Sequence, residues 1–129
     1  MKTRLIDDVA WNFEDQNDIT ISLTYYGQVD KLIHHCDFFS NIDDTLKEKI
    51  TVQFMNDAFP DKGIFEDVVK AYEHRFNLKA FTVKQDIGFN NHGCRNLAML
   101  QSETHWNWLI DIDVFFKEEL LKAMVNTKL

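Results

Sequence analysis

One stretch decides the fold: Ile19-Thr-Ile-Ser-Leu-Thr-Tyr-Tyr-Gly27. Its first six residues are β-branched or apolar apart from a serine, which predicts a strand over Ile19–Thr24. After Gly27, apolar residues recur at the spacing of an amphipathic helix, at Val29, Leu32, Ile33 and Cys36. A strand followed directly by such a helix is the repeating unit of a parallel sheet.

The remainder of the chain repeats this unit. Residues 1–18 are polar and acidic, and further strands are predicted at Ile50–Met55, Leu78–Val83 and Trp106–Asp111. A helix is expected after each strand, and its apolar residues should face inward. These are Phe65, Val68, Val69, Tyr72 and Phe76 in one helix, and Leu120, Leu121 and Met124 in the last helix, Glu118–Val125. The alternation predicts an α/β fold, with a mainly parallel sheet and helices on both faces.

Length and composition limit the classes of protein. The chain has 129 residues, 45% of them hydrophobic, and no linker or repeat interrupts it, so we expect residues 1–129 to form a single domain. The formal net charge of −7 argues against a nucleic-acid partner, which needs clustered Lys and Arg. An acidic domain that binds a phosphorylated ligand needs a cation between the two negative charges.

The same features indicate a cytoplasmic protein. The first residues contain no apolar leader segment, and no apolar run reaches the length of a membrane span. Cys36 and Cys94 are the two cysteines, and we expect both to be reduced thiols.

Residues directly after the strands are the candidates for function, because ligands of open α/β sheets bind outside the carboxyl ends of the strands. Asp111 and Asp113 follow the last strand, where residues i and i+2 of extended chain point to the same side. Both carboxylates are then expected to face one Mg²⁺ or Mn²⁺ ion. The alternative is a solvated pair that caps the final helix.

The other strand ends offer further candidates. Asp57 is suited to accept hydrogen bonds from a ribose or a base, whereas turn formation alone also explains Asn56 and Asp61. Gly88 to Asn96 enters a helix, where Arg95 either contacts a phosphate, holds the acids by an ion pair, or is a plain surface residue.

Aromatic and histidine side chains complete the survey. Tyr25 and Tyr26 are candidates to stack on a base, and core packing of one of them is the alternative. Trp106 and Trp108 are expected in the core, His34-His35 in solvent, and His92 is not expected to bind a metal.

The strand-end segments resemble those of family 2 glycosyltransferases. Thr20-Ile-Ser-Leu-Thr-Tyr-Tyr-Gly-Gln28 is similar to the opening strand of the family, and Met55-Asn-Asp-Ala-Phe-Pro-Asp61 is similar to its Val-Asp-Asp-Gly-Ser-x-Asp segment. Gly88 to Asn96 resembles its Asn-x-Gly…Ala-Arg-Asn stretch, and Asp111-Ile-Asp113 resembles its Asp-x-Asp. The resemblance covers residues 19 to about 125. This chain departs from the pattern at Thr24, Asn56 and Ala58-Phe59.

The resemblance implies a GT-A fold, a Rossmann-like domain that binds a nucleotide-diphosphate sugar with Mn²⁺ or Mg²⁺. Thr24, Tyr26 and Asp57 would line the nucleoside, Asp111 would lie near the ribose or sugar, and Asp113, with Asp111, would hold the metal. The residues implied near the donor pocket are Gly88, Arg95 and Asn96.

The resemblance also implies an acceptor-binding half that carries the catalytic base. Only sixteen residues follow Asp113, so we expect that half in a missing domain or a partner subunit. The acceptor and the base are not identified. The chain is thus expected to be a glycosyltransferase donor domain, and the alternative is a non-catalytic nucleotide-sugar-binding or structural module.

Two other classes fit less well. A receiver-like signalling domain would have paired acids after its first strand, where this chain has Thr24-Tyr-Tyr. A nucleotidyltransferase would have a basic, glycine-rich loop there, and Gly27-Gln28 is not one.

Overall fold

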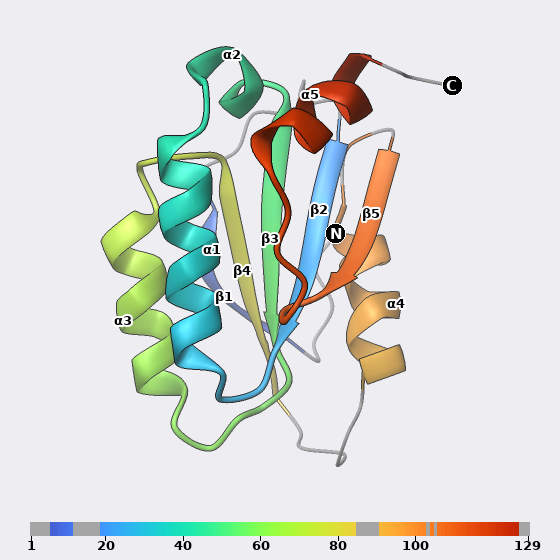
Figure 1. The fold of residues 1–129 in the computed structure, drawn as a ribbon. Coiled ribbons are helices and arrows are strands. Elements are labelled where there is room, and N and C mark those ends of the chain that lie inside the picture. The colour runs from blue at the N-terminus through green and yellow to red at the C-terminus, as the bar shows by residue number, and fades with distance from the viewer. Residues whose placement is uncertain (1–5, 12–18, 85–90, 103, 105, 127–129) are drawn as a thin grey trace.

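The computed structural model describes residues 6–11, 19–84, 91–102, 104 and 106–126. Their strands form one five-stranded sheet in the order β1-β4-β3-β2-β5 (Figure 1). The strands are β1 (Ile6–Trp11), β2 (Ile19–Tyr25), β3 (Ile50–Asn56), β4 (Leu78–Val83) and β5 (Trp106–Asp111). All pairings among β2, β3, β4 and β5 are parallel, which confirms the mainly parallel sheet.

β1 is a strand that the sequence pattern did not indicate. It pairs antiparallel with β4 at the edge of the sheet, and its register shifts between Asp8 and Ala10. Such a shift breaks the alternation of side chains between the two faces, which is the signal by which a half-buried strand is recognised. Two adjacent aspartates weaken that signal further.

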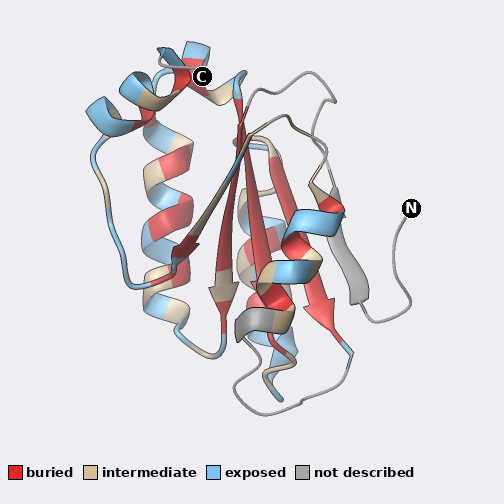
Figure 2. Cartoon of the chain, turned by 90° about the vertical axis from the view of Figure 1, so that its right-hand side faces the viewer, coloured by how far each residue is buried: buried red, intermediate tan, exposed pale blue. Residues whose placement is uncertain are grey.

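Helices cover both faces of the sheet, as predicted (Figures 1 and 2). α1 (Val29–Asn41) and α3 (Lys62–Tyr72) lie on one face, and α4 (Asn91–Gln101) lies on the other. The short α2 (Asp44–Lys47) and α5 (Glu118–Asn126) lie at the amino-terminal ends of the parallel strands. Within the described part of the chain, no helix combines the length and the apolar character that crossing a membrane requires.

The two faces of the sheet pack differently. The α1 and α3 side holds the larger core, to which Leu23, Phe54 and Phe65 belong. On the α4 side a smaller apolar cluster is joined by buried polar groups. Gln53 Nε2 donates to Ala98 O at 2.8 Å, and Lys79 Nζ donates to the carbonyl of Gln101. Hydrogen bonds to its own carbonyls therefore help to hold α4 on the sheet.

Cys36 and Cys94 are both free and buried. Cys36 belongs to the core on the α1 side and Cys94 to the cluster under α4, so the sheet lies between them. A disulfide needs Cα atoms within about 7 Å, which this separation by the sheet does not allow.

The buried faces of two helices differ from the prediction. Ile33 is 37% exposed and Leu120 is 43% exposed, although both were expected to point inward. α1 instead buries Leu32, His35, Cys36 and Phe39, which are spaced by three, one and three residues. A polar residue thus takes the core position that the apolar pattern assigned to Ile33, and hydrophobicity alone does not identify such a face.

Candidate functional site

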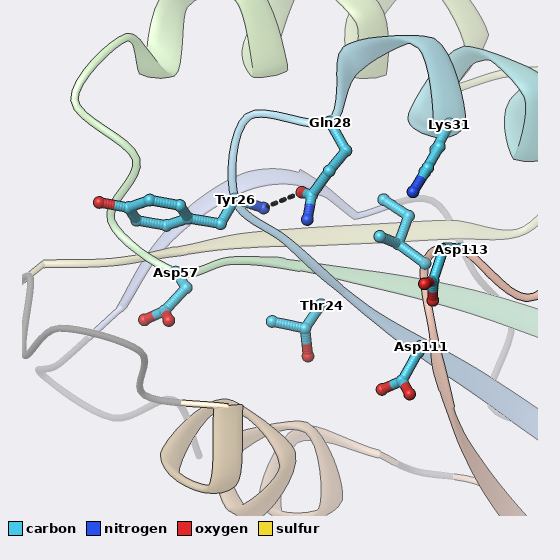
Figure 3. A pocket seen from close by; sticks show the side chains of 8 residues that line it. Thr24, Tyr26, Gln28, Lys31, Asp57, Asp111 and Asp113 are labelled. Carbon is cyan, nitrogen blue, oxygen red and sulfur yellow. Dashed lines mark hydrogen bonds between the residues drawn. The ribbon is translucent and has the colours of Figure 1, made fainter.

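The site lies where β2, β3 and β5 end side by side. Thr24 on β2 is in register with Met55 on β3 and with Asp111 on β5. A cavity of about 420 Å³ opens at this edge (Figure 3). Its lining residues are Thr24, Tyr26, Gln28, Lys31, Asp57, Asp111, Ile112 and Asp113. The predicted convergence of Asp57, Asp111 and Asp113 at one edge of the sheet is therefore confirmed.

Asp57 is held in place from two sides. It is only 4% exposed, and its backbone N–H donates to Tyr25 O at 2.9 Å. On the α4 side, the thiol of Cys94 donates a hydrogen bond to its carboxylate. Burial, followed by the charge of Asp57 and this hydrogen bond, raises the pKa of Cys94 to about 12. The thiol therefore stays protonated and can keep donating to Asp57.

The residues beside Asp57 belong to a turn, which was the alternative interpretation of this segment. Asn56 is buried, and its Oδ1 accepts a hydrogen bond from Phe59 N at 3.1 Å. Ala58 follows with a φ of 56°, in the left-handed region. Asp61 precedes α3 as its N-cap residue and is exposed. Asn56 thus serves the geometry of the loop, Asp61 makes no side-chain capping hydrogen bond, and Asp57 faces the cavity.

The two tyrosines after β2 have different environments. Tyr25 is buried, with its ring centroid 5.0 Å from that of Phe65, and Tyr26 is 42% exposed and lines the cavity. The turn between β2 and α1 needs Gly27, whose φ is +87°. A Cβ at this position would lie 2.7 Å from Cε1 of Phe59. Core packing is therefore the role of Tyr25, and Tyr26 is the tyrosine within reach of a ligand.

The segment of Asp111 and Asp113 is not extended, which corrects the geometry expected for it. β5 ends at Asp111, and Val114 N donates to Asp111 O at 3.0 Å, which closes a turn. The rule that residues i and i+2 share a side holds only within a strand, so it does not apply here. Both carboxylates still line the cavity because the turn wraps its rim, with Ile112 buried between them.

Arg95 contacts one of these acids. Its Nη2 lies 2.6 Å from Asp111 Oδ1, and the two side chains are 33% and 59% exposed. Of the three roles left open for Arg95, the ion pair to an acid is the one observed. Asn96 is exposed on α4 and is not among the described residues that line the cavity. Gly88 lies outside the described residues.

His35 is buried, contrary to the expectation that both histidines of α1 are solvated. It is 1% exposed, and its Nε2 lies 2.7 Å from the carbonyl oxygen of Ile112. Burial is the main cause that lowers its pKa, the neighbouring His34 adds to it, and the hydrogen bond to Ile112 opposes it. A neutral ring is therefore favoured in the folded protein.

The whole arrangement was compared with known proteins. The sequence matches no protein-family model and none of the curated proteins. Among solved structures, the fold is similar to that of S. aureus TarS, a glycosyltransferase, with a TM-score of 0.67 and 20% identity. The chain has a glycosyltransferase fold.

The similarity extends to two further TarS structures. The complex of TarS with UDP-GlcNAc gives a TM-score of 0.66, and the complex with UDP gives 0.62, both at 20% identity. All three matches cover 84% of this chain but only 30% or 31% of the TarS chain. The chain thus spans about a third of the length of this glycosyltransferase, and the expected fold is confirmed.

Two residues of this glycosyltransferase fold join the cavity without having been predicted. Gln28 and Lys31 lie at the start of α1, and Gln28 Oε1 accepts a hydrogen bond from Tyr26 N at 2.6 Å. Lys31 brings a positive charge to a wall that otherwise carries three carboxylates. Their position just after the first strand end was the available signal.

The carboxylates of the cavity suit a hard dication that also binds phosphate. Oxygen ligands from one or two carboxylates, with the rest from phosphates and water, are typical of Mg²⁺ and Mn²⁺ sites. The described residues contain no group of three or more His, Cys, Asp or Glu side chains placed to hold a metal ion. Asp111 and Asp113 therefore fit a metal that arrives with a phosphorylated ligand better than a closed structural site.

Proposed function

We propose that this chain is the donor-binding domain of a glycosyltransferase and binds a nucleotide-diphosphate sugar together with Mn²⁺ or Mg²⁺. One observation supports it most: a single cavity on a glycosyltransferase fold gathers Thr24, Tyr26 and three aspartates from three separate strand ends. Ligands of open α/β sheets bind at this edge.

The two ends of the cavity suit the two ends of such a ligand. At one end the ring of Tyr26 offers an aromatic face for a base, and Asp57 is placed to accept hydrogen bonds from base N–H or ribose hydroxyl groups (Figure 3). At the other end, Asp111 and Asp113 would hold the metal, with Asp113 as the main ligand because Arg95 already pairs with Asp111.

Charge explains why a metal belongs to this proposal. The chain carries a net charge of −7, and the lining residues include three carboxylates and one lysine. A diphosphate would be repelled from this wall unless a cation lies between them. When bound, the metal would neutralise the diphosphate and so help it to leave the sugar.

The test is the binding of UDP, chosen because TarS was solved in complex with UDP and with UDP-GlcNAc. Calorimetric titration in MnCl₂ is expected to show binding that EDTA abolishes. Asp113→Ala is expected to weaken it by at least about tenfold, since loss of a ligand costs no less than loss of a supporting contact.

Asp67→Ala is the matched control, because Asp67 is an exposed aspartate of α3 and does not line the cavity. It should leave UDP affinity unchanged. Equal UDP affinity with Mn²⁺ and with EDTA would contradict metal-dependent binding. If neither UDP nor a panel of other nucleoside diphosphates binds at all, the donor-domain proposal fails.

A binding module without turnover is the alternative, and one observation favours it. Glu118 and Glu119, the acids nearest the end of the chain, begin α5 at the amino-terminal ends of the strands (Figure 1). Glu118 Oε2 accepts a hydrogen bond from Asp43 N at 3.3 Å there. Neither is placed to deprotonate an acceptor at the cavity. Transfer of sugar from UDP-GlcNAc to any acceptor would exclude this alternative.

A further inference from the structure

α1 contributes two residues to the site from successive turns. Lys31 and His35 are four residues apart, so they project from the same side of the helix, one turn after the other. Lys31 lines the cavity, and His35 is buried beneath the segment that carries Asp111 and Asp113. The same helix therefore lines the cavity through Lys31 and contacts the buried side of the 111–113 segment through His35.

The contact of His35 is a directed one. The carbonyl oxygen of Ile112 can only accept, so Nε2 carries the proton and donates at 2.7 Å. The imidazole ring also packs against Phe115, with ring centroids 4.9 Å apart, and against Phe116 at 6.1 Å. The ring is thus held between α1 and the residues that follow the turn.

The bonded carbonyl lies at a point that controls Asp113. The C=O of Ile112 and the N–H of Asp113 belong to one planar peptide unit. A hydrogen bond to this oxygen therefore sets the orientation of the plane from which Asp113 projects. Asp111 has its own ties, to Arg95 at 2.6 Å and to Val114 N at 3.0 Å.

We propose that His35 is a positioning residue, which holds the Ile112–Asp113 peptide against α1 and thereby fixes the Asp113 carboxylate at the cavity. What that carboxylate binds rests on the proposed function. The anchoring itself does not, and it is tested separately.

The first test needs no ligand. Gln at position 35 keeps an amide donor near the place of Nε2, whereas Asn carries its amide one bond short of it. Hydrogen–deuterium exchange should show the amide of Val114, which donates to Asp111 O, exchanging on the order of tenfold faster in His35→Asn, and near the wild-type rate in His35→Gln. The amides of β3 serve as the internal reference. Exchange at Val114 that is equal in both variants and in the wild type would overturn the anchor.

The second test separates positioning from a general loss of stability. UDP affinity in MnCl₂ is measured for the wild type, His35→Asn, Asp113→Ala and the double variant. If His35 acts through Asp113, His35→Asn weakens binding by about tenfold alone and adds nothing in the Asp113→Ala background. Equal weakening in both backgrounds would contradict that route.

The two tests fail independently. If the wild type does not bind UDP or any other nucleoside diphosphate, the proposed function falls, and the exchange rates still decide on the anchor. If His35→Asn leaves exchange unchanged, the anchor falls, whatever the chain binds.

Discussion

Lys31 adds a positive charge that makes the cavity more favourable for an anion. Lys31 lies in the first turn of α1 and is the only positively charged side chain among the described lining residues. The same lining residues include three carboxylates. Backbone N–H groups at the start of a helix also favour negative charge nearby. Under the proposed function, a diphosphate would therefore meet two sources of positive potential besides a metal.

We expect Lys31→Gln to weaken UDP binding in MnCl₂ by roughly threefold to tenfold, since it removes one charge-assisted contact at a partly exposed site. Uridine, which lacks phosphate, should bind the variant and the wild type equally. Both affinities are measured by calorimetry. Lys70→Gln, at an exposed lysine of α3, is the control and should change neither. A matching loss for uridine would show that Lys31 shapes the cavity and does not contact phosphate.

Individual residues differed in how far their sequence context identified them. Asp57, Asp111 and Asp113 were predicted at one edge because strand ends converge in a parallel sheet. Lys31 and His35 were not, because a polar residue on a helix carries no sign of which way it faces. The burial of His35 depends on a carbonyl 77 residues further along the chain.

Two loops pack against each other at the Tyr26 end of the cavity. The turn at Gly27 joins β2 to α1, and the turn at Asn56 joins β3 to α3. Phe59 of the second turn lies against the first, with its ring centroid 5.1 Å from that of Tyr26. The position of Tyr26 is thus set by the contact between the loops.

Gly27→Ala should disturb this contact. A methyl group would meet the Phe59 ring at 2.7 Å, and a φ of +87° is strained for alanine. We expect the free energy of unfolding to fall by about 1–3 kcal/mol and UDP affinity to fall with it. Urea denaturation and calorimetry measure the two quantities.

Gly63→Ala is the matched control for this change. Gly63 is in the first turn of α3, and a Cβ there would meet its nearest neighbour, Asp61 Oδ1, at an ordinary 3.6 Å. Helix propensity favours alanine at such a position, so this variant should be as stable as the wild type or more stable by up to about 1 kcal/mol. If both variants lose stability alike, the loop contact is not the reason.

The four parallel strands were predicted best. β4 and β5 have the expected limits, and β2 and β3 extend one residue further. β2, β3 and β4 are buried along nearly all of their length, and their runs of mostly apolar or β-branched residues are visible in the sequence. β5 is a partly exposed edge strand, and its regular register with β2 keeps a recognisable strand pattern. β1 was missed because its register is irregular, and α2 because four residues give no helical period.

In the whole molecule, the cavity and the last helix lie at opposite ends of the sheet. The cavity lies at the carboxyl ends of the parallel strands, and α2 and α5 lie at their amino-terminal ends (Figure 1). The chain spans 31% of the TarS chain in the match with the highest TM-score given above. Under the proposed function, the residues that align and deprotonate an acceptor are therefore other than Glu118 and Glu119.

We expect residues 1–129 alone to bind UDP-GlcNAc but to transfer its sugar slowly or not at all. Positioning of the acceptor and general-base catalysis each contribute on the order of 10²-fold or more, and neither has an assigned residue here. A single-turnover assay with radiolabelled donor and a panel of acceptors measures it. Slow release of free sugar is compatible with the proposal, whereas rapid glycosylation would require a base among residues 1–129.

The two cysteines lie on opposite faces of the sheet, so their reactivity reports separately on the opening of each face. Each thiol is buried in a different layer. A thiol reagent therefore reaches Cys36 only when the α1 side opens, and reaches Cys94 only when α4 moves away from the sheet. Equal waiting times would mean that the molecule opens only as a whole. Unequal waiting times would show which layer opens more readily. Because Cys94 is hydrogen-bonded to Asp57, opening of α4 would also disturb the Asp57 end of the cavity.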